Sequence, residues 1–335
     1  MKLLNDKSLK AIIGMIAFAA AMVFAPQRAA AQSLSAQLAD RDIAVSEFNA
    51  INVSDDFEVT VSRGTYGVRL TVDKDLAPYV EVYVRSKTLY ISYDEKAVPK
   101  DLRKVYRGKG APTPVFRVMA YTPELKSVTL ADNATRTAVQ EFVSSDFELT
   151  AAGKSQVKNL SVTAPSAKIV LRKNAIATLN IKTDRGVEVN TDNNANLKLT
   201  FTGKELALNA DGSSVVVADG PTTSLNLMTG GSSQVSVTSD TEKVDLTTEG
   251  SSHLTLTGKA LEMKVKGSRS SSVDAFAMPL ETVEATLSNS SNVTVSVSKK
   301  VYANLVGGSA LYYSGSPEFQ IEKIVKSTLA PYGTK

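Results

Sequence analysis

The sequence predicts an all-β chain that folds as a parallel β-solenoid with coils of about 19–20 residues. The first observation is a repeated Gly-Ser-Ser motif whose glycines, Gly212, Gly231 and Gly250, are nineteen residues apart. The second is an apolar pair before each motif, and the third is another apolar pair after it. The members of a pair are two residues apart, which is strand periodicity with the intervening side chain directed outward.

Apolar positions continue this period over residues 115–318, where we expect regular coils of a single solenoid domain that begins at residue 48. A second column starts two residues after the first, at Leu130, and a third runs from Val157 to Val293. The first column, with spacings of 19 or 20 residues, is Val128, Phe147, Ala167, Val187, Leu206, Leu225, Val244, Met263 and Val283.

The period slips near the C-terminus. Tyr302 and Asn304 fall where apolar residues are due. We therefore expect that coil to close the stack, with residues 319–335 as a C-terminal tail.

Small residues between the paired strands predict a sharp corner, because Gly and Asn tolerate a left-handed backbone. Lys173 interrupts this column, and Gly267 comes early, which predicts a bulged corner in its coil. We expect the hydroxyls of the serines directly after the glycines, such as Ser213, to bond backbone groups at the corner. The predicted corner residues are Gly153, Asn193, Gly212, Gly231, Gly250, Asn289 and Gly308.

The N-terminal residues 1–31 predict a secretory signal peptide. A lysine-containing start precedes an apolar run of about fifteen residues, and an A-x-A site places cleavage between Ala31 and Gln32. The alternative is an uncleaved membrane anchor, but the apolar run is short for a membrane span.

Composition narrows the classes of partner. The chain has no cysteine, so neither disulfides nor a lipid-attachment cysteine are expected. Without residues 1–31, the 38 basic and 34 acidic residues become 34 and 33, a net charge of +1. A near-neutral exported chain is not expected to bind nucleic acid. No later apolar stretch is long enough for a transmembrane segment.

The first part of the mature chain divides into three segments. Residues 32–47 predict a loosely held lead-in, and residues 48–95 alternate like the opening strands of the solenoid. Residues 96–114 contain three prolines, two glycines and six basic side chains, which predicts a projecting basic loop. One interpretation is that it contacts an anionic glycan or a lipid head group. The other is a solvated insertion, and this is favoured because runs of charge on loops usually face water. Its candidate contact residues are Lys100, Arg103, Lys104, Arg107 and Lys109.

No arrangement of residues predicts catalysis. Asp219 and Asp240 fall in comparable turns of adjacent coils, and Asp211 and Glu249 lie two coils apart. Glycoside hydrolysis needs two carboxylates on one face, yet no basic or aromatic residues gather around either pair. We expect no enzyme; a polysaccharide lyase or glycosidase is the less favoured alternative.

No metal or cofactor site is expected. His253, the only histidine, is expected to face outward beside a serine corner, and a metal site would need further ligands near it. Phosphate-binding and dinucleotide-binding motifs are absent from the sequence.

The strand set at 48–93, the Gly-Ser-Ser coils and the closing motif Ser314-Gly315-Ser316-Pro317 after Gly308-Ser309 resemble the "putative auto-transporter adhesin, head GIN domain" family. The resemblance covers roughly residues 48–317. It implies a right-handed single-stranded β-helix exported by Gram-negative bacteria, with no catalytic residues to carry over. The basic insertion at 96–114 departs from the family's usual pattern.

We therefore expect an exported interaction protein of the cell envelope or cell surface, in the periplasm, on the outer membrane or outside the cell. Its polar face of Ser, Thr, Asn, Gln and Lys suits weak, repeated contacts with glycans or proteins. The alternative is a periplasmic structural scaffold without an adhesion role.

Overall fold

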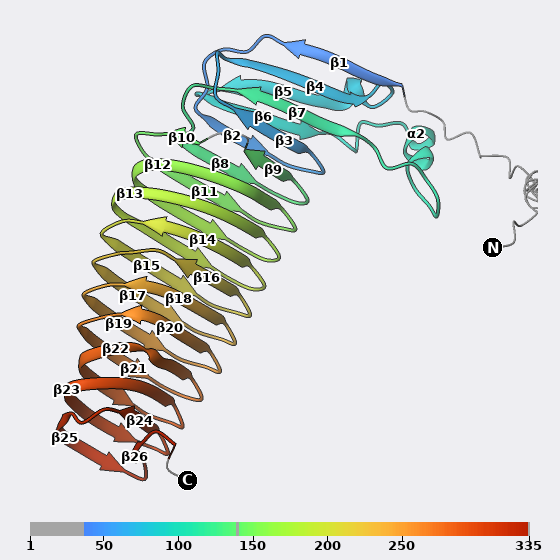
Figure 1. The fold of residues 1–335 in the computed structure, drawn as a ribbon. Helices are drawn as coiled ribbons and strands as arrows, with labels where there is room; N and C mark the ends of the chain where they lie inside the picture. Colours follow the sequence, from blue (N-terminus) through green and yellow to red (C-terminus); the bar gives the residue numbers. More distant parts are fainter. Residues whose placement is uncertain (1–36, 139–140, 334–335) are drawn as a thin grey trace, which may run out of the picture.

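The computed structural model describes residues 37–138 and 141–333, and these form a β-solenoid of about 11 turns (Figure 1). Strands account for 62% of the residues and helices for 3%, which confirms the predicted all-β solenoid. The predicted signal peptide, residues 1–31 with cleavage between Ala31 and Gln32, lies outside the described residues.

The N-terminal end contains seven strands and two short helices. They are β1 (Leu38–Ile43), β2 (Ala50–Val53), β3 (Glu58–Ser62), β4 (Gly67–Asp73), the 3-10 helix η1 (Ala77–Tyr79), β5 (Val80–Arg85), β6 (Thr88–Tyr93), α2 (Lys100–Val105) and β7 (Phe116–Tyr121).

The coils that follow are built from strands alone. They are β8 (Ser127–Leu130), β9 (Thr135–Ala138), β10 (Phe142–Val143), β11 (Phe147–Ala151), β12 (Gln156–Leu171), β13 (Ile176–Thr191), β14 (Asn196–Thr202), β15 (Glu205–Ala210), β16 (Val215–Asp219), β17 (Ser224–Thr229), β18 (Gln234–Asp240), β19 (Lys243–Thr248), β20 (His253–Lys259), β21 (Glu262–Gly267), β22 (Ser272–Leu287), β23 (Asn292–Val306), β24 (Ala310–Ser314), β25 (Glu318–Val325) and β26 (Thr328–Pro331).

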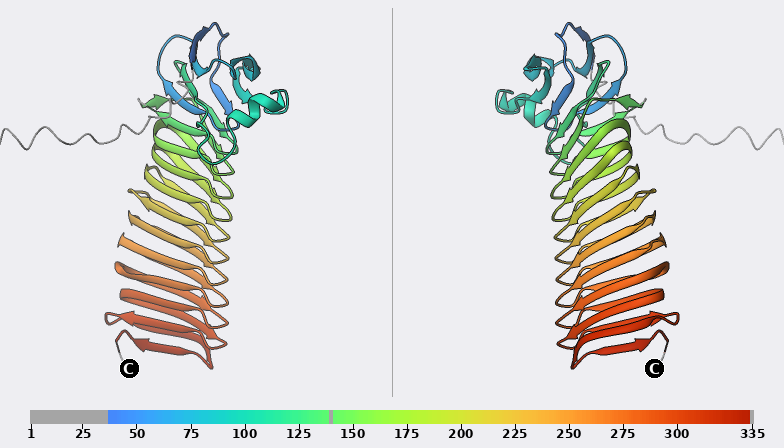
Figure 2. Two further views of the ribbon diagram at one scale, coloured as in Figure 1. Left: turned by 90° about the vertical axis from the view of Figure 1, so that its right-hand side faces the viewer. Right: turned by 90° about the vertical axis from the view of Figure 1, so that its left-hand side faces the viewer.

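Two parallel ladders run the length of the rod, and both side views in Figure 2 show their coils stacked along one axis. The long strands β12, β13, β22 and β23 belong to both ladders, with their N-terminal halves in the second and their C-terminal halves in the first. The other members of the first ladder are β6, β2, β8, β11, β15, β17, β19, β21 and β25. The other members of the second ladder are β7, β3, β9, β14, β16, β18, β20, β24 and β26.

The predicted apolar columns form the core. In the second ladder, the column from Val157 to Val293 lies in register from coil to coil, as predicted. In the first ladder the same is true from Phe147 to Val283. These side chains belong to one continuous buried cluster, so each coil is stabilised by its neighbours.

The register differs from the prediction at both ends of the first column. Val128 pairs with Leu149 and not with Phe147, because this coil has 21 residues. Val283 pairs with Val301, because that coil has only 18. Tyr302 and Asn304 therefore face outward, and their coil does not close the stack.

Residues at both ends also contribute more strands than expected. Residues 319–335, expected as a tail, supply most of β25 and all of β26, which pair with β23 and β24. Within the expected lead-in 32–47, β1 pairs antiparallel with β4. The tail was not predicted because its coils have 18 residues and not 19 or 20. The strand β1 was not predicted because antiparallel pairing follows no coil period.

The basic segment 96–114 is not simply a projecting loop. It contains the helix α2, which the sequence analysis did not predict. Val98 is buried, and Leu102 and Tyr106 pack against the core cluster, so apolar side chains hold the segment to the rod.

The corner residues hold a left-handed backbone in successive coils. The predicted corner residues have φ values from 51° at Asn289 to 80° at Gly308. Lys173 and Arg269 also occupy this conformation, with φ of 62° and 63°. Gly267 is instead the last residue of β21 and pairs with Thr248, so its coil keeps an ordinary corner and the predicted bulge is wrong.

Backbone hydrogen bonds join each corner to the next. The amide of Ser232 donates to the carbonyl oxygen of Gly212 at 2.6 Å, and the amide of Ser251 donates to that of Gly231 at 2.7 Å. The corners approach so closely that a Cβ at Gly231 would lie 2.5 Å from the oxygen of Gly212. Glycine therefore serves both the left-handed φ and the close stacking here.

A line of hydroxyl groups lies buried behind these corners. The second serine of each motif, such as Ser214, contributes to this line, whereas Ser213 and the other first serines are exposed. Thr191 donates to Ser214 at 3.1 Å, and Thr248 donates to Ser271 at 3.1 Å. The hydroxyls that bond the corner thus belong to second serines, one residue later than predicted.

Arg136 is a buried charge in the first coils. It occupies an inward position of β9 between Val59 and Val157 and is fully buried. Its three guanidinium nitrogens have no hydrogen-bond partner in the described part of the chain. Burial lowers its pKa to about 9, so the guanidinium is still charged at neutral pH. An unpaired buried charge destabilises the folded state.

Removing one complete coil should be milder than removing half of one. Deletion of Leu225 through Lys243 joins Ser224 to Val244 and keeps every column in register. Deletion of only Leu225 through Gln234 removes the Gly231 corner and exposes several apolar side chains, at about 1.5–3 kcal/mol each. Urea unfolding should give a cooperative transition for the longer deletion and a lower midpoint for the shorter one. Equal midpoints, or a lower one for the longer deletion, would contradict the stacked-coil account.

Replacing Arg136 by Met should stabilise the protein. The change removes an unpaired charge and keeps an unbranched side chain, so we expect a gain of about 1–4 kcal/mol in the free energy of unfolding. Arg172→Met, at an exposed corner position, is the control and should change stability by less than about 0.5 kcal/mol. A loss of stability in the Arg136 variant alone would show that the guanidinium is stabilised where it lies.

Candidate functional site

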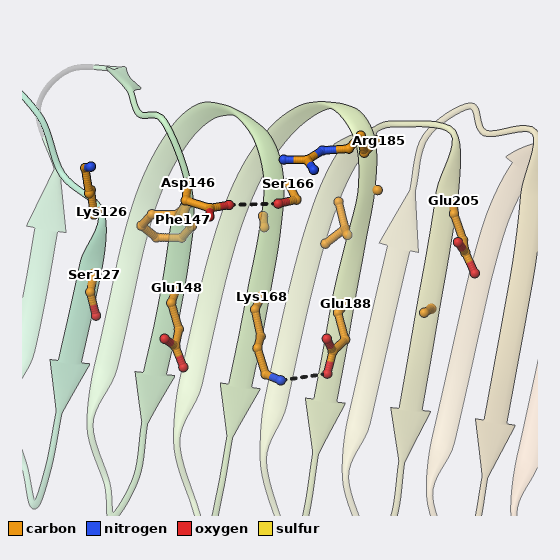
Figure 3. A pocket seen from close by; sticks show the side chains of 14 residues that line it. Lys126, Ser127, Asp146, Phe147, Glu148, Ser166, Lys168, Arg185, Glu188 and Glu205 are labelled. Atoms are coloured by element: carbon orange, nitrogen blue, oxygen red, sulfur yellow. Dashed lines mark hydrogen bonds and ion pairs between the residues drawn. The ribbon is translucent and has the colours of Figure 1, made fainter.

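A groove lies on the outer side of the first ladder, across β8, β11, β12, β13 and β15 (Figure 3). Its volume is about 760 Å³. Most of its lining is polar or charged: Lys126, Ser127, Asp146, Phe147, Glu148, Ser166, Ala167, Lys168, Arg185, Gly186, Val187, Glu188, Glu205 and Ala207.

Small outward residues create the hollow. Ser127, Ser166, Gly186 and Ala207 occupy outward positions on neighbouring strands, where other coils carry longer side chains. A Cβ at Gly186 would lie 2.8 Å from the backbone oxygen of Glu205, so the chain approaches its neighbour closely there. The lining is therefore shaped by residues that the strand register brings together.

Two polar contacts order the centre of the groove. Lys168 Nζ lies 3.0 Å from a carboxylate oxygen of Glu188, and the hydroxyl of Ser166 donates to Asp146 at 2.8 Å. The hydrogen bond from Lys168, with a second from Asn190, holds the pKa of Glu188 below its ordinary value. Glu188 is therefore ionised at neutral pH and keeps Lys168 in place.

Three charged side chains of the groove are exposed and available. Glu148, Arg185 and Glu205 make no side-chain hydrogen bond or ion pair with another residue in the described ranges. They present donors and acceptors of both signs around a hollow surface. This arrangement suits a polar ligand with many hydroxyl or amide groups better than a ligand of one strong charge.

The predicted contact residues of the basic segment lie elsewhere and do not form one cationic surface. Arg103 and Arg107 line a hollow of about 390 Å³ that also contains four acidic residues. Arg107 pairs with Glu95, and Lys104 pairs with Asp101 at 3.1 Å. Lys100, Lys104 and Lys109 are exposed. Their role as ligand contacts stays a prediction. The four acids of the hollow are Asp55, Asp56, Glu95 and Asp132.

Asp219 and Asp240, considered for catalysis, are not aligned with each other. Asp219 pairs with Thr238 of the next coil, while Asp240 pairs with Lys259, so the predicted correspondence of Asp219 and Asp240 is wrong by two positions. Their residues are both exposed.

The two other acids are engaged at the corners. Asp211 accepts a hydrogen bond from the amide of Gly212 at 2.7 Å. Glu249 lies 3.7 Å from Arg269. Both contacts are local and belong to the corner, so these acids have a structural explanation.

His253 faces outward on the second ladder between Gln234 and Ser272, as its register predicts. Its ring lies 3.4 Å from the hydroxyl of Thr255. In the described ranges, His, Cys, Asp and Glu residues form no group of three or more that could hold a metal ion.

The groove was not predicted from the sequence. A signal was present: Glu148, Lys168 and Glu188 occur at outward positions 20 residues apart with alternating charge. The small residues beside them are unremarkable in the sequence, and only the register shows that they adjoin.

Among residues 37–138 and 141–333, no helix is both long enough and apolar enough to cross a membrane.

Comparison with protein families gives a match over most of the chain. A family described as "Putative auto-transporter adhesin, head GIN domain" matches residues 47–185 and 173–317. Among curated proteins, no match is found.

Solved structures with similar chains include three from Parabacteroides species. "A putative adhesin from Parabacteroides merdae ATCC 43184" is 19% identical, with 89% of this chain and 97% of that chain covered and a TM-score of 0.34. A "putative adhesin from Parabacteroides distasonis ATCC 8503" is also 19% identical, with coverage of 89% and 98% and a TM-score of 0.32. A "putative lipid binding protein" from the same strain is 15% identical, with coverage of 89% and 97% and a TM-score of 0.30.

Replacing Asp219 and Asp240 together by Asn should change the free energy of unfolding by less than about 0.5 kcal/mol, because both side chains are exposed and lie in different registers. Asp211→Ala is the contrasting variant. It removes the hydrogen bond to Gly212 and should cost about 0.5–1.5 kcal/mol. Urea denaturation measures both. A large loss in the double variant would show that the two carboxylates support the fold.

Proposed function

The chain belongs to the "Putative auto-transporter adhesin, head GIN domain" family, and from this membership we propose that it is an exported interaction protein of the cell envelope or cell surface. It binds glycans or proteins through the groove on the outer side of the first ladder. The family description supports a role in surface interaction, and the location that follows is the periplasm, the outer-membrane surface or the outside of the cell. Neither the family description nor the names of the similar structures refer to an enzyme.

The observation that carries the proposed site is the set of unpaired charges around the groove. Glu148, Arg185 and Glu205 surround a hollow whose floor is made of small residues. Side chains that already have partners in the protein must give them up to bind a ligand, whereas these three do not.

The solenoid suits this role because its surface is rigid before a ligand binds. Outward side chains stand on strands that are hydrogen-bonded on both edges, so little backbone order is lost on binding. Repeated coils also let one extended ligand contact several rows at once, which raises the overall affinity of weak contacts.

Binding to immobilised glycosaminoglycans, mucin glycans and extracellular-matrix proteins tests the proposal. We expect the purified protein to bind at least one of these probes. Arg185→Ala with Glu205→Ala should weaken that binding about tenfold or more, equivalent to about 1.4 kcal/mol. The matched control is Lys198→Ala with Asp219→Ala, which removes one cation and one anion from the outer side of the second ladder.

Two results would overturn the assignment. Equal binding by the groove variant and the wild type would exclude the groove as the site. Failure to bind any of the probes would remove the support for a surface-interaction role with these ligands.

A further inference from the structure

The coil that contains β25 leaves its interior uncovered. Its inward residues Phe319, Ile321 and Ile324 are 40%, 52% and 37% exposed. Their partners one coil earlier, Val301, Ala303 and Leu305, are 0%, 2% and 0% exposed. Side chains that fill the core everywhere else in the rod here face solvent, and a contiguous exposed apolar surface marks an interaction site.

The opposite end of the rod is covered. Antiparallel strands close it: β1 pairs with β4, β4 pairs with β7, and β5 pairs with β6. The inward residues Val68, Leu70 and Val72 of β4 are buried. One copy therefore cannot stack its uncovered coil head-to-tail on the first coil of another.

The exposed strand carries its two acids before its two lysines. Glu318 begins β25 and Glu322 lies near its middle, whereas Lys323 follows Glu322 directly and Lys326 lies just after the strand. Within the described ranges, β25 pairs with β23 alone, and none of these four side chains forms an ion pair. The edge of β25 away from β23 is thus open and dipolar.

We propose that this end binds a second copy of the same chain, tail to tail, about a twofold axis across the rod. A twofold axis perpendicular both to the rod and to β25 sets the two β25 strands antiparallel and keeps their inward side chains on the same side. Because the acids precede the lysines, the acidic end of one strand then lies beside the basic end of the other. The apolar residues Phe319, Ile321 and Ile324 of both copies are removed from water together.

The irregularity of β25 makes this contact selective. The register with β23 shifts between Ala303 and Asn304, which leaves Glu322 as an extra residue and directs both Ile321 and Ile324 inward. Bulges and edge lysines discourage uncontrolled strand pairing. A parallel contact would place like charges together, so the same residues that prevent open-ended aggregation favour the closed twofold dimer.

Charge-swapped variants test the proposal. The protein, expressed from its full-length sequence and purified after export, should be a dimer by light scattering and sedimentation velocity. Lys323→Glu with Lys326→Glu makes the strand wholly acidic, and Glu318→Lys with Glu322→Lys makes it wholly basic. Each variant alone should dissociate at protein concentrations about tenfold higher than the wild type or more. An equimolar mixture of the two should dimerise again, as a mixed pair.

The control is Lys158→Glu with Lys198→Glu, which makes the same change in net charge at exposed positions of the second ladder and should leave the dimer intact. A wild-type protein that is monomeric at every concentration tested would overturn the proposal. So would a mixture of the acidic and basic variants that stays monomeric while both variants retain the circular dichroism of the wild type. Neither result bears on the groove, whose binding is measured separately.

Discussion

The left-handed corner is the constraint on which the rest of the rod depends. At this corner each coil passes from the first ladder to the second, and the backbone takes a positive φ there while the corner amide donates to the coil before it. The hydrogen bond from Ser232 to Gly212 and its equivalents therefore set the spacing between coils at the same points where the chain turns. Where Lys173 and Arg269 take the place of glycine, the conformation is kept although it costs an L-residue about 1–2 kcal/mol. The pairing of the strands on both sides of the corner therefore fixes its conformation, even where the local residue does not favour it.

The regular part of the fold could be predicted from the sequence because coils in contact are also neighbours in the chain. A fixed period translates directly into a register, and the columns from Phe147 to Val283 followed from it. The prediction failed where the coil length changed. Val128 and Val301 are shifted because the turn from the second ladder back to the first holds more residues in the 21-residue coil and fewer in the 18-residue coil, while the strands stay aligned. Antiparallel β1 and the helix α2 were missed, since neither obeys a coil period.

The groove was beyond prediction for a different reason. Its shape depends on the sizes of Gly186, Ser166 and Ala207 beside one another, and its chemistry on which charges remain unpaired. Which side chains pair, as Lys168 does with Glu188, depends on contacts between neighbouring coils, and the sequence shows these contacts only indirectly. The basic segment illustrates the converse: its six basic side chains stood out in the sequence, yet Arg103 and Arg107 line a hollow with acids in the folded chain. Conspicuous charge in a sequence and available charge on a surface are different quantities.

The near-identical Gly-Ser-Ser corners have a consequence for the gene. Segments that encode almost the same corner at a constant interval favour unequal recombination, and each such event adds or removes a whole coil. The rod would then lengthen or shorten in steps of one strand spacing, about 4.8 Å. Its outer faces would keep their orientation, and the ends would be untouched. The length of the rod can thus vary between lineages without a new fold or a new surface having to evolve.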